Sequence, residues 1–99
     1  MLQAQIFIDM EQRMEEQSLH DYILQFLLEH NIIGATSFKG LEGFGQNHKI
    51  KRPNELFSFD EPPVMIVFID QENKVRSVLA ELRARIHHGF FAVSQVETF

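Results

Sequence analysis

Apolar residues recur along the chain with two different periods, and each period predicts one type of secondary structure. The segment from Leu2 to Asp9 alternates between two faces, which is typical of a strand that lies on a core. One face carries Ala4, Ile6 and Ile8, and the other carries Gln3, Gln5 and Phe7. We therefore expect a strand with one fully apolar face near the start of the chain.

Two longer segments have the spacing that places apolar side chains on one face of a helix. The first begins after Ser18, whose hydroxyl can accept a hydrogen bond from the amide of Asp21, and stops near Asn31. The second follows Asp70, which we predict as its cap, and Gly89 suits the position after its end. The expected buried stripes are Leu19, Tyr22, Ile23, Phe26 and Leu27 in the first helix, and Val75, Val78, Leu79, Leu82 and Ile86 in the second.

Three further strands are predicted at residues 32–39, 64–69 and 90–96. Residues 10–17 are interpreted as a loop or an early helical turn. Residues 46–61 are interpreted as a polar loop whose far arm, with Leu56, Phe57 and Phe59, passes into a strand. The resulting order β-α-β-β-α-β indicates one α+β domain over residues 1–99 with the ferredoxin-like arrangement.

The strand at residues 64–69 is apolar at every position, so both of its faces should be covered. Two helices can cover only one face of a small sheet. Leu24 and Leu28 also lie off the buried stripe of the first helix, where a single copy would leave them in water. The pattern therefore predicts a symmetric oligomer in which another subunit covers the second face.

Composition narrows the classes of function. With 44% hydrophobic and 23% charged residues the chain should fold, and its net charge of -5 argues against binding to nucleic acid. The absence of cysteine excludes disulfides, thiolate catalysis and zinc–thiolate sites. The first residues do not have the pattern of a signal peptide, and the apolar run at residues 62–69 is too short to span a bilayer, so we expect a cytoplasmic protein.

The glycine-rich segment at residues 40–45 is the first candidate for a ligand site, because closely spaced glycines let backbone amides approach a phosphate or carboxylate. It is neither a Walker A loop nor a dinucleotide fingerprint, and a simple tight turn is the alternative. Lys49, Lys51 and Arg52 follow it and could close over an anionic ligand, or could belong to a solvated loop.

Little in the sequence points to metal binding or catalysis. His48 is a weak metal candidate, while His87 and His88, next to Arg83 and Arg85, suit the charge balance of a helix end. No set of serine, histidine and aspartate is visible, and no carboxylates are paired with a nucleophile. We therefore do not expect an enzyme.

Residues 34–45, Gly-Ala-Thr-Ser-Phe-Lys-Gly-Leu-Glu-Gly-Phe-Gly, resemble the PII-like proteins. The similarity is to an uncharacterised branch related to the nitrogen-regulatory protein PII, which has Gly-Ala-Thr-x-Phe-(Arg/Lys)-Gly-x-x-Gly-Phe-Gly at this place. The segment Pro-Val-Met-Ile-Val-Phe-Ile-Asp at residues 63–70 matches a second pattern of that branch. The resemblance extends from about Leu19 to Val96.

This resemblance implies a homotrimer of ferredoxin-like subunits whose sheets face the threefold axis, and a role in signal transduction. It also implies that residues 40–62 contain the flexible T-loop, the element that contacts target proteins in PII, and that adenine nucleotides bind between subunits. The ligand-binding residues expected from the resemblance and from the loop are Thr36, Lys39, Gly40, Gly43, Phe44, Gly45, Gln46, Lys49, Lys51 and Arg52.

The sequence departs from PII at two places. PII has Gly-Phe-Gly-Arg-Gln, whose glutamine helps to hold a metal and a 2-oxo acid, whereas Gln46 and Asn47 follow the glycine here. PII also has a phosphate loop, Gly-Asp-Gly-Lys, before its last strand, whereas His87, His88 and Gly89 lead directly into the strand here. The resemblance therefore does not imply ATP binding in the manner of PII, and it leaves a smaller nucleotide or another small anion open as the ligand.

The leading hypothesis is a trimeric sensor whose loop regulates a target protein, with a membrane-associated target among the options. One alternative is a metal-binding trimer that resembles CutA-type proteins, with His48, His87 and His88 as ligands. The other alternative is a small enzyme, because ferredoxin-like folds support many chemistries.

Overall fold

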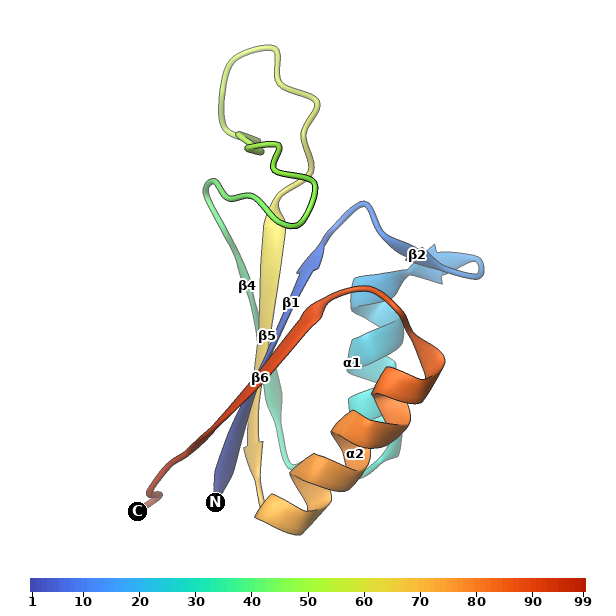
Figure 1. Ribbon diagram of the computed structural model, residues 1–99, viewed down its shortest axis with the longest axis vertical. Coiled ribbons are helices and arrows are strands. Elements are labelled where there is room, and N and C mark those ends of the chain that lie inside the picture. Colours follow the sequence, from blue (N-terminus) through green and yellow to red (C-terminus); the bar gives the residue numbers. More distant parts are fainter.

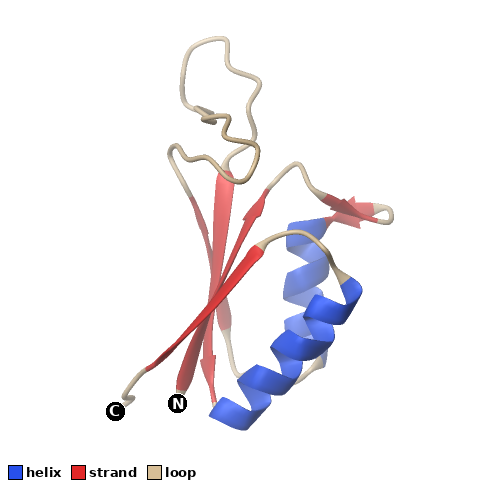
Figure 2. Ribbon diagram, in the orientation of Figure 1, coloured by secondary structure: helices blue, strands red, loops and turns tan.

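The computed structural model describes residues 1–99 as a four-stranded antiparallel sheet with two helices on one face (Figures 1 and 2). Its elements are β1 (Leu2–Asp9), β2 (Arg13–Met14), β3 (Gln17–Ser18), α1 (Leu19–Glu29), β4 (Ala35–Lys39), β5 (Pro63–Asp70), α2 (Glu72–Arg85) and β6 (Phe90–Gln95). The sheet order is β4-β5-β1-β6, and β2 and β3 form a separate hairpin. The predicted β-α-β-β-α-β order is confirmed, with this hairpin added.

Strand β1 lies in the middle of the sheet, where it pairs with β5 on one side and β6 on the other. Its side chains alternate as predicted: Ala4, Ile6 and Ile8 are buried toward the helices, while Phe7 is exposed on the other face. Strand β5 also alternates, since Val64, Ile66 and Phe68 are buried and the residues between them are partly open. One chain therefore builds a core on only one face of its sheet.

Helix α1 follows its prediction closely. The Ser18 hydroxyl accepts a hydrogen bond from the amide of Asp21 at 3.1 Å, and the helix ends at Glu29 before Asn31 adopts a left-handed backbone with φ of 61°. The buried residues of the helix are Leu19, Ile23, Phe26 and Leu27, with Tyr22 packed at the edge of the core. Leu24 also packs partly against the core, but Leu28 is exposed, as expected for a single copy.

The predicted cap of helix α2 was wrong. Gln71 occupies the cap position, and its side chain makes no capping hydrogen bond. Asp70 ends β5 instead, and its buried carboxylate accepts hydrogen bonds from the amides of Gln71 at 2.8 Å and Ile33 at 3.1 Å. Its Oδ2 also lies 3.3 Å from the Lys74 ammonium. Burial raises the pKa of Asp70, but these hydrogen bonds and Lys74 outweigh burial, and the pKa is lowered overall.

Other boundaries differ from the predictions. The β2–β3 hairpin occupies residues 13–18, where residues 10–17 were predicted as a loop or an early helical turn, and no strand forms in residues 46–61. Strand β4 begins three residues later than predicted, because the left-handed Asn31 and the bond between Ile33 and Asp70 hold the chain away from the sheet. Gly89 does not directly follow α2, which ends at Arg85; it has a φ of 88° and leads into β6. Neither helix has the length and apolarity needed to cross a bilayer.

Candidate functional site

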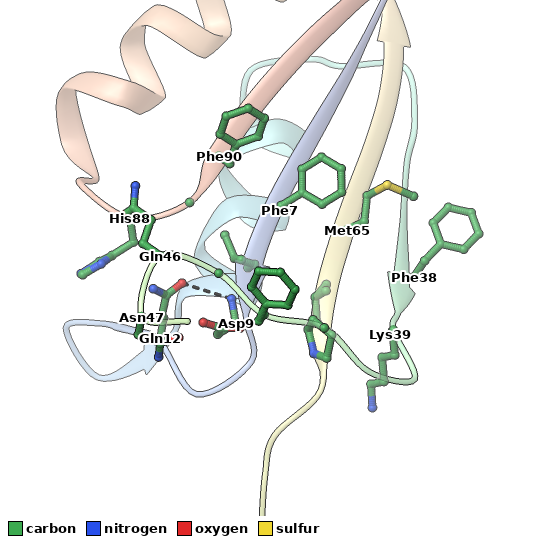
Figure 3. Close-up of a pocket in the computed structure, with 18 of the residues that line it drawn as sticks. Phe7, Asp9, Gln12, Phe38, Lys39, Gln46, Asn47, Met65, His88 and Phe90 are labelled. Carbon is green, nitrogen blue, oxygen red and sulfur yellow. Dashed lines mark hydrogen bonds between the residues drawn. The ribbon is translucent and has the colours of Figure 1, made fainter. Parts of the chain in front are cut away.

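An apolar row crosses the face of the sheet that the helices leave open. Phe90 of β6 pairs with Phe7 of β1, Phe7 pairs with Met65 of β5, and Met65 pairs with Phe38 of β4. We call these four residues the apolar ladder, and Figure 3 shows them side by side across the four strands. The exposed fraction is 40% for Phe7, 51% for Phe38 and 67% for Phe90. The sheet thus presents a continuous apolar shelf to solvent.

The ladder forms one side of a pocket of about 580 Å³ at the end of the sheet from which the long loop departs. Three connections close the other sides: residues 39–47 after β4, the turn after β1, and the turn between α2 and β6. Polar side chains from these connections gather beyond the ladder in Figure 3, namely Asp9, Gln12, Gln46, Asn47 and His88. The pocket therefore has an apolar part and a polar part.

Close packing at Gly40 fixes the path of the loop. Its amide donates a hydrogen bond to the carbonyl of Pro63 at 2.7 Å, and a Cβ atom at this position would lie 2.8 Å from Cγ of Pro63. Only glycine fits this approach without displacing Pro63. Farther along, Lys51 donates its amide to the Gly43 carbonyl at 2.8 Å, and Gly43 donates to the Lys51 carbonyl at 3.3 Å. These bonds form a neck that holds residues 43–45 against the pocket.

The turn between α2 and β6 is held by Arg83. Its guanidinium donates hydrogen bonds to the carbonyls of His88 at 3.1 Å and Gly89 at 3.0 Å, and it stacks over the ring of Phe91 at 3.7 Å. Gly89 is required here because its φ is 88° and a Cβ would lie 3.0 Å from Ile8. This arrangement places His87 and His88 in the pocket wall.

The structure gathers six of the predicted ligand-binding residues and separates the other four. Those in the pocket wall are Lys39, Gly40, Gly43, Phe44, Gly45 and Gln46. Thr36 lies on the same strand as Phe38, one row beyond the ladder, where it pairs with Val67 outside the pocket. Lys49, Lys51 and Arg52 also lie outside the pocket lining.

Two residues of the basic cluster are engaged within the chain. The Lys51 side chain is buried and contacts the carboxylates of Glu11 and Asp9, the latter at 3.6 Å, so it is not part of a solvated loop. Burial lowers the pKa of Lys51, but the hydrogen bond to Glu11 and the charges of Asp9 and Glu11 outweigh burial and raise it. Arg52 is half-exposed and lies 3.5 Å from Glu55.

A serine–histidine–aspartate chain exists that the sequence did not reveal. His20 Nε2 lies 2.7 Å from Ser37 Oγ, and His20 Nδ1 lies 3.1 Å from Asp21 Oδ1. Sequence spacing gave no signal, because Ser37 is 17 residues from His20 on another element. The chain of bonds lies between α1 and β4, away from the pocket, and ties the start of the helix to the edge of the sheet.

The histidines do not form a metal site within one chain. No group of three histidine, cysteine, aspartate or glutamate side chains is close enough to hold a metal ion. His87 and His88 line the pocket, whereas His48 does not. The three ligands of the CutA-like alternative are therefore not brought together in a single subunit.

Several pocket residues were missed from the sequence, chiefly Phe7, Asp9, Gln12, Met65 and Phe90, and His88 was named only as a metal ligand in the CutA-like alternative. Phe7 could have been suspected, because it occupies the otherwise polar face of its strand. Asp9 and Gln12 gave no signal, since only the fold brings the turn after β1 next to residues 43–47.

Comparisons with known proteins give a consistent result. The sequence profile of the DUF190 family, described as Uncharacterized ACR, COG1993, matches residues 1–98. The chain is 29% identical over 93 residues to a UPF0166 protein from Aquifex aeolicus (strain VF5), which covers 93% of this chain and 87% of that protein.

Similar solved structures include CPII, a nitrogen regulatory PII-like protein from Thiomonas intermedia K12, bound to ADP, AMP and bicarbonate. It has a TM-score of 0.68 and 19% identity, covering 94% of this chain and 82% of that chain. The same protein bound to ADP and bicarbonate has a TM-score of 0.63 and 20% identity, with the same coverage of both chains. These likenesses confirm the PII-like ferredoxin-like fold that the sequence predicted.

Proposed function

The chain belongs to the DUF190 family, and from its PII-like fold and its two-part pocket we propose that it is a sensor for a small adenine nucleotide. The nucleotide would bind between the apolar ladder and residues 43–45. Binding would change the loop of residues 46–61, and that loop would regulate a partner protein in the cytoplasm.

The division of the pocket into an apolar and a polar part is the observation that carries this proposal. Aromatic rings form platforms on which a flat base can stack, and such stacking contributes about 1–3 kcal/mol per base. Phe7, Phe44 and Phe90 supply rings around the apolar part. His88 and the amides of Phe44 and Gly45 supply donors for an anionic group at the other part.

The absence of the PII phosphate-loop sequence favours AMP or ADP over ATP. The turn between α2 and β6 is short and carries His87 and His88 in place of a glycine-flanked lysine. The similar protein CPII was solved with ADP, AMP and bicarbonate, which supports the same ligand class here. A small anion beside the nucleotide is compatible with the polar part of the pocket.

The open sheet face supports assembly into a homotrimer. The ladder residues are too exposed for a finished core, and a second copy placed on this face would cover them and close the pocket. The threefold symmetry comes from the resemblance to PII. Each ligand would then lie between two subunits.

The loop is connected to the pocket through the neck at Gly43 and Lys51. A ligand that contacts residues 43–45 would favour the neck conformation that fits it best. It can shift the loop only by the difference in its affinity for the two loop states. Regulation of a partner therefore requires that the partner, too, distinguishes these states.

Calorimetry with adenosine, AMP, ADP, ATP and cyclic AMP tests the proposal. We expect saturable heat with AMP or ADP, and a loss of about 5- to 150-fold in affinity for Phe44→Ala if its ring stacks on the base. Leu41→Ala is the matched control, because Leu41 is an exposed apolar residue of the same loop that lies outside the pocket. Absence of heat with every nucleotide would refute the nucleotide sensor.

A further inference from the structure

Lys51 is a buried cation in the return arm of an otherwise exposed loop. Its exposed fraction is 5%, and Lys51 and Asp70 are the only charged residues that the fold buries. The ammonium contacts two carboxylates: that of Asp9, the last residue of β1, and that of Glu11, just after the strand. We call these three residues the Lys51 node. An ammonium group is buried at such a position only when carboxylates compensate for its lost hydration.

The node reaches the ligand pocket by two routes. The Lys51 backbone bonds in both directions with Gly43, which lines the pocket. The Lys51 side chain lies 3.6 Å from Asp9, which also lines the pocket, at its polar part. One residue of the loop therefore contacts two separate walls of the pocket, while its own side chain stays outside the lining.

Asp9 presents a difficulty for an anionic ligand. Its carboxylate faces the polar part of the pocket in Figure 3, where the phosphate of a nucleotide would lie under the proposed function. Like charges in a partly buried site repel strongly, because water screens them less than at an open surface. In the structure the neck is paired, and the Lys51 ammonium 3.6 Å from Asp9 offsets this repulsion.

We propose that Lys51 is the residue that couples the loop of residues 46–61 to the pocket. In the closed neck it holds Gly43 in the pocket wall and neutralises Asp9, so that an anionic ligand is accepted. When the neck opens, the wall loosens and Asp9 repels the ligand. This inference rests on the proposed function for its ligand, and it assigns Lys51 a positioning role in place of direct contact with the ligand.

Ligand charge provides the test that separates this coupling from a merely structural role. For Lys51→Met we expect an affinity loss of about tenfold for ADP, a smaller loss for AMP and less than about twofold for adenosine, because only charged ligands interact with the unbalanced Asp9. Lys51→Arg keeps the cation and should restore most of the ADP affinity. Glu11→Gln should change the ADP affinity in the opposite direction, so that ADP binds more tightly. The reason is that the Lys51 ammonium then compensates the charge of Asp9 alone.

Arg13→Met is the charge-matched control. Arg13 is an exposed cation on the neighbouring hairpin, and its substitution removes the same unit of charge without touching the node. The affinity of the Arg13→Met protein for ADP should change by less than about twofold at physiological salt, where surface charges are screened. If Lys51→Met loses equal affinity for adenosine and for ADP, the electrostatic coupling is overturned.

Amide hydrogen exchange without ligand tests the neck independently. Exchange at Gly43 and at position 51, whose amides bond across the neck, should accelerate in Lys51→Met, remain slow in Lys51→Arg, and be unchanged in Arg13→Met, with β1 and β5 equally protected in all variants. Unchanged exchange at Gly43 and at position 51 in Lys51→Met would overturn the coupling even if nucleotides bind. If the unmodified protein binds no nucleotide, the proposed function fails, and the exchange comparison alone decides whether Lys51 holds the neck.

Discussion

The two faces of the sheet are built by the same strands but end in different states. On the helix side, Ile6 of β1 and Ile66 of β5 are fully buried and paired with each other. On the other side, their neighbours Phe7 and Met65 are also paired, yet Phe7 is 40% exposed. The difference shows that a single chain completes one core and leaves a second apolar surface for another use.

The open face is not uniformly apolar. Toward the chain termini Gln3, Gln5 and Ser94 lie on this face beside Val67 and Ile69, whereas at the loop end all four strands contribute an apolar residue to the ladder. A surface made only for subunit contact would not need to place its aromatic residues beside a glycine turn and a polar cluster. The ladder can serve both the assembly and the proposed ligand.

The largest expected effect is on the closed face. Ile66→Ala should lower the free energy of unfolding by about 2–5 kcal/mol, because it removes a fully buried side chain and leaves a cavity. Met65→Ala, one residue away on the open face, should cost less than about 1.5 kcal/mol under conditions that keep subunits apart. Urea denaturation measures both. Equal losses in the free energy of unfolding for the two variants would contradict the distinction between the two faces.

A charge on the open face should break the proposed assembly. Phe7→Glu places a carboxylate in the ladder, and we expect the dissociation constant of the oligomer to rise by at least about 100-fold, which is about 2.7 kcal/mol. Sedimentation velocity over a range of concentrations measures this change. Leu56→Glu is the control, because Leu56 is an exposed apolar residue that lies outside both the ladder and the pocket. An unmodified protein that sediments as a single 11.6 kDa species would contradict the trimer.

The buried carboxylate on the helix side should make stability depend on pH. Asp70→Asn should cost about 1–3 kcal/mol at neutral pH, because the Ile33 and Gln71 amides lose a charged acceptor. The pKa of Asp70 is lowered by folding, so its contribution is fully present above the ordinary value of 3.8 and disappears as the pH falls through the lower folded pKa. Denaturation series from pH 7 to pH 2 should therefore show the two proteins converging in acid. A constant difference would contradict this role.

The smallest effect is expected at the loop. Leu56, Phe57 and Phe59 are almost fully exposed, so Phe57→Ser and Phe59→Ser should change the free energy of unfolding by less than about 0.5 kcal/mol. Thermal denaturation measures this directly. A clear loss of stability would show that the loop packs against the sheet and would remove the contrast between the exposed loop and the buried Lys51.

Much of the fold could be predicted because its signals are local. The alternation in β1, the Ser18 cap and the apolar stripes of both helices each depend on residues within one or two turns. The errors occurred where a distant contact overrode local preference. Asp70 looks like a helix cap in sequence, but its position next to Ile33, 37 residues away, makes it a buried link between two connections.

The candidate site was predicted only in part for the same reason. The glycine motif identified residues 40–45 because close backbone approach limits the choice of residue, as the contact between Gly40 and Pro63 illustrates. The basic residues after it were grouped by their spacing alone. Lys51 is instead drawn to Glu11, 40 residues away, and its charge is balanced there.

The sequence by itself determined the type and order of the main elements, the family resemblance, and the need to cover a doubly apolar strand, since these follow from periodicity and motif. Only the tertiary structure decided which side chains share a pocket. Strand register aligned Phe90, Phe7, Met65 and Phe38 into one row, and the turns brought Asp9, Lys51 and His88 to the same end of the sheet. Pairing and packing join residues far apart in the chain, and no local pattern records these contacts.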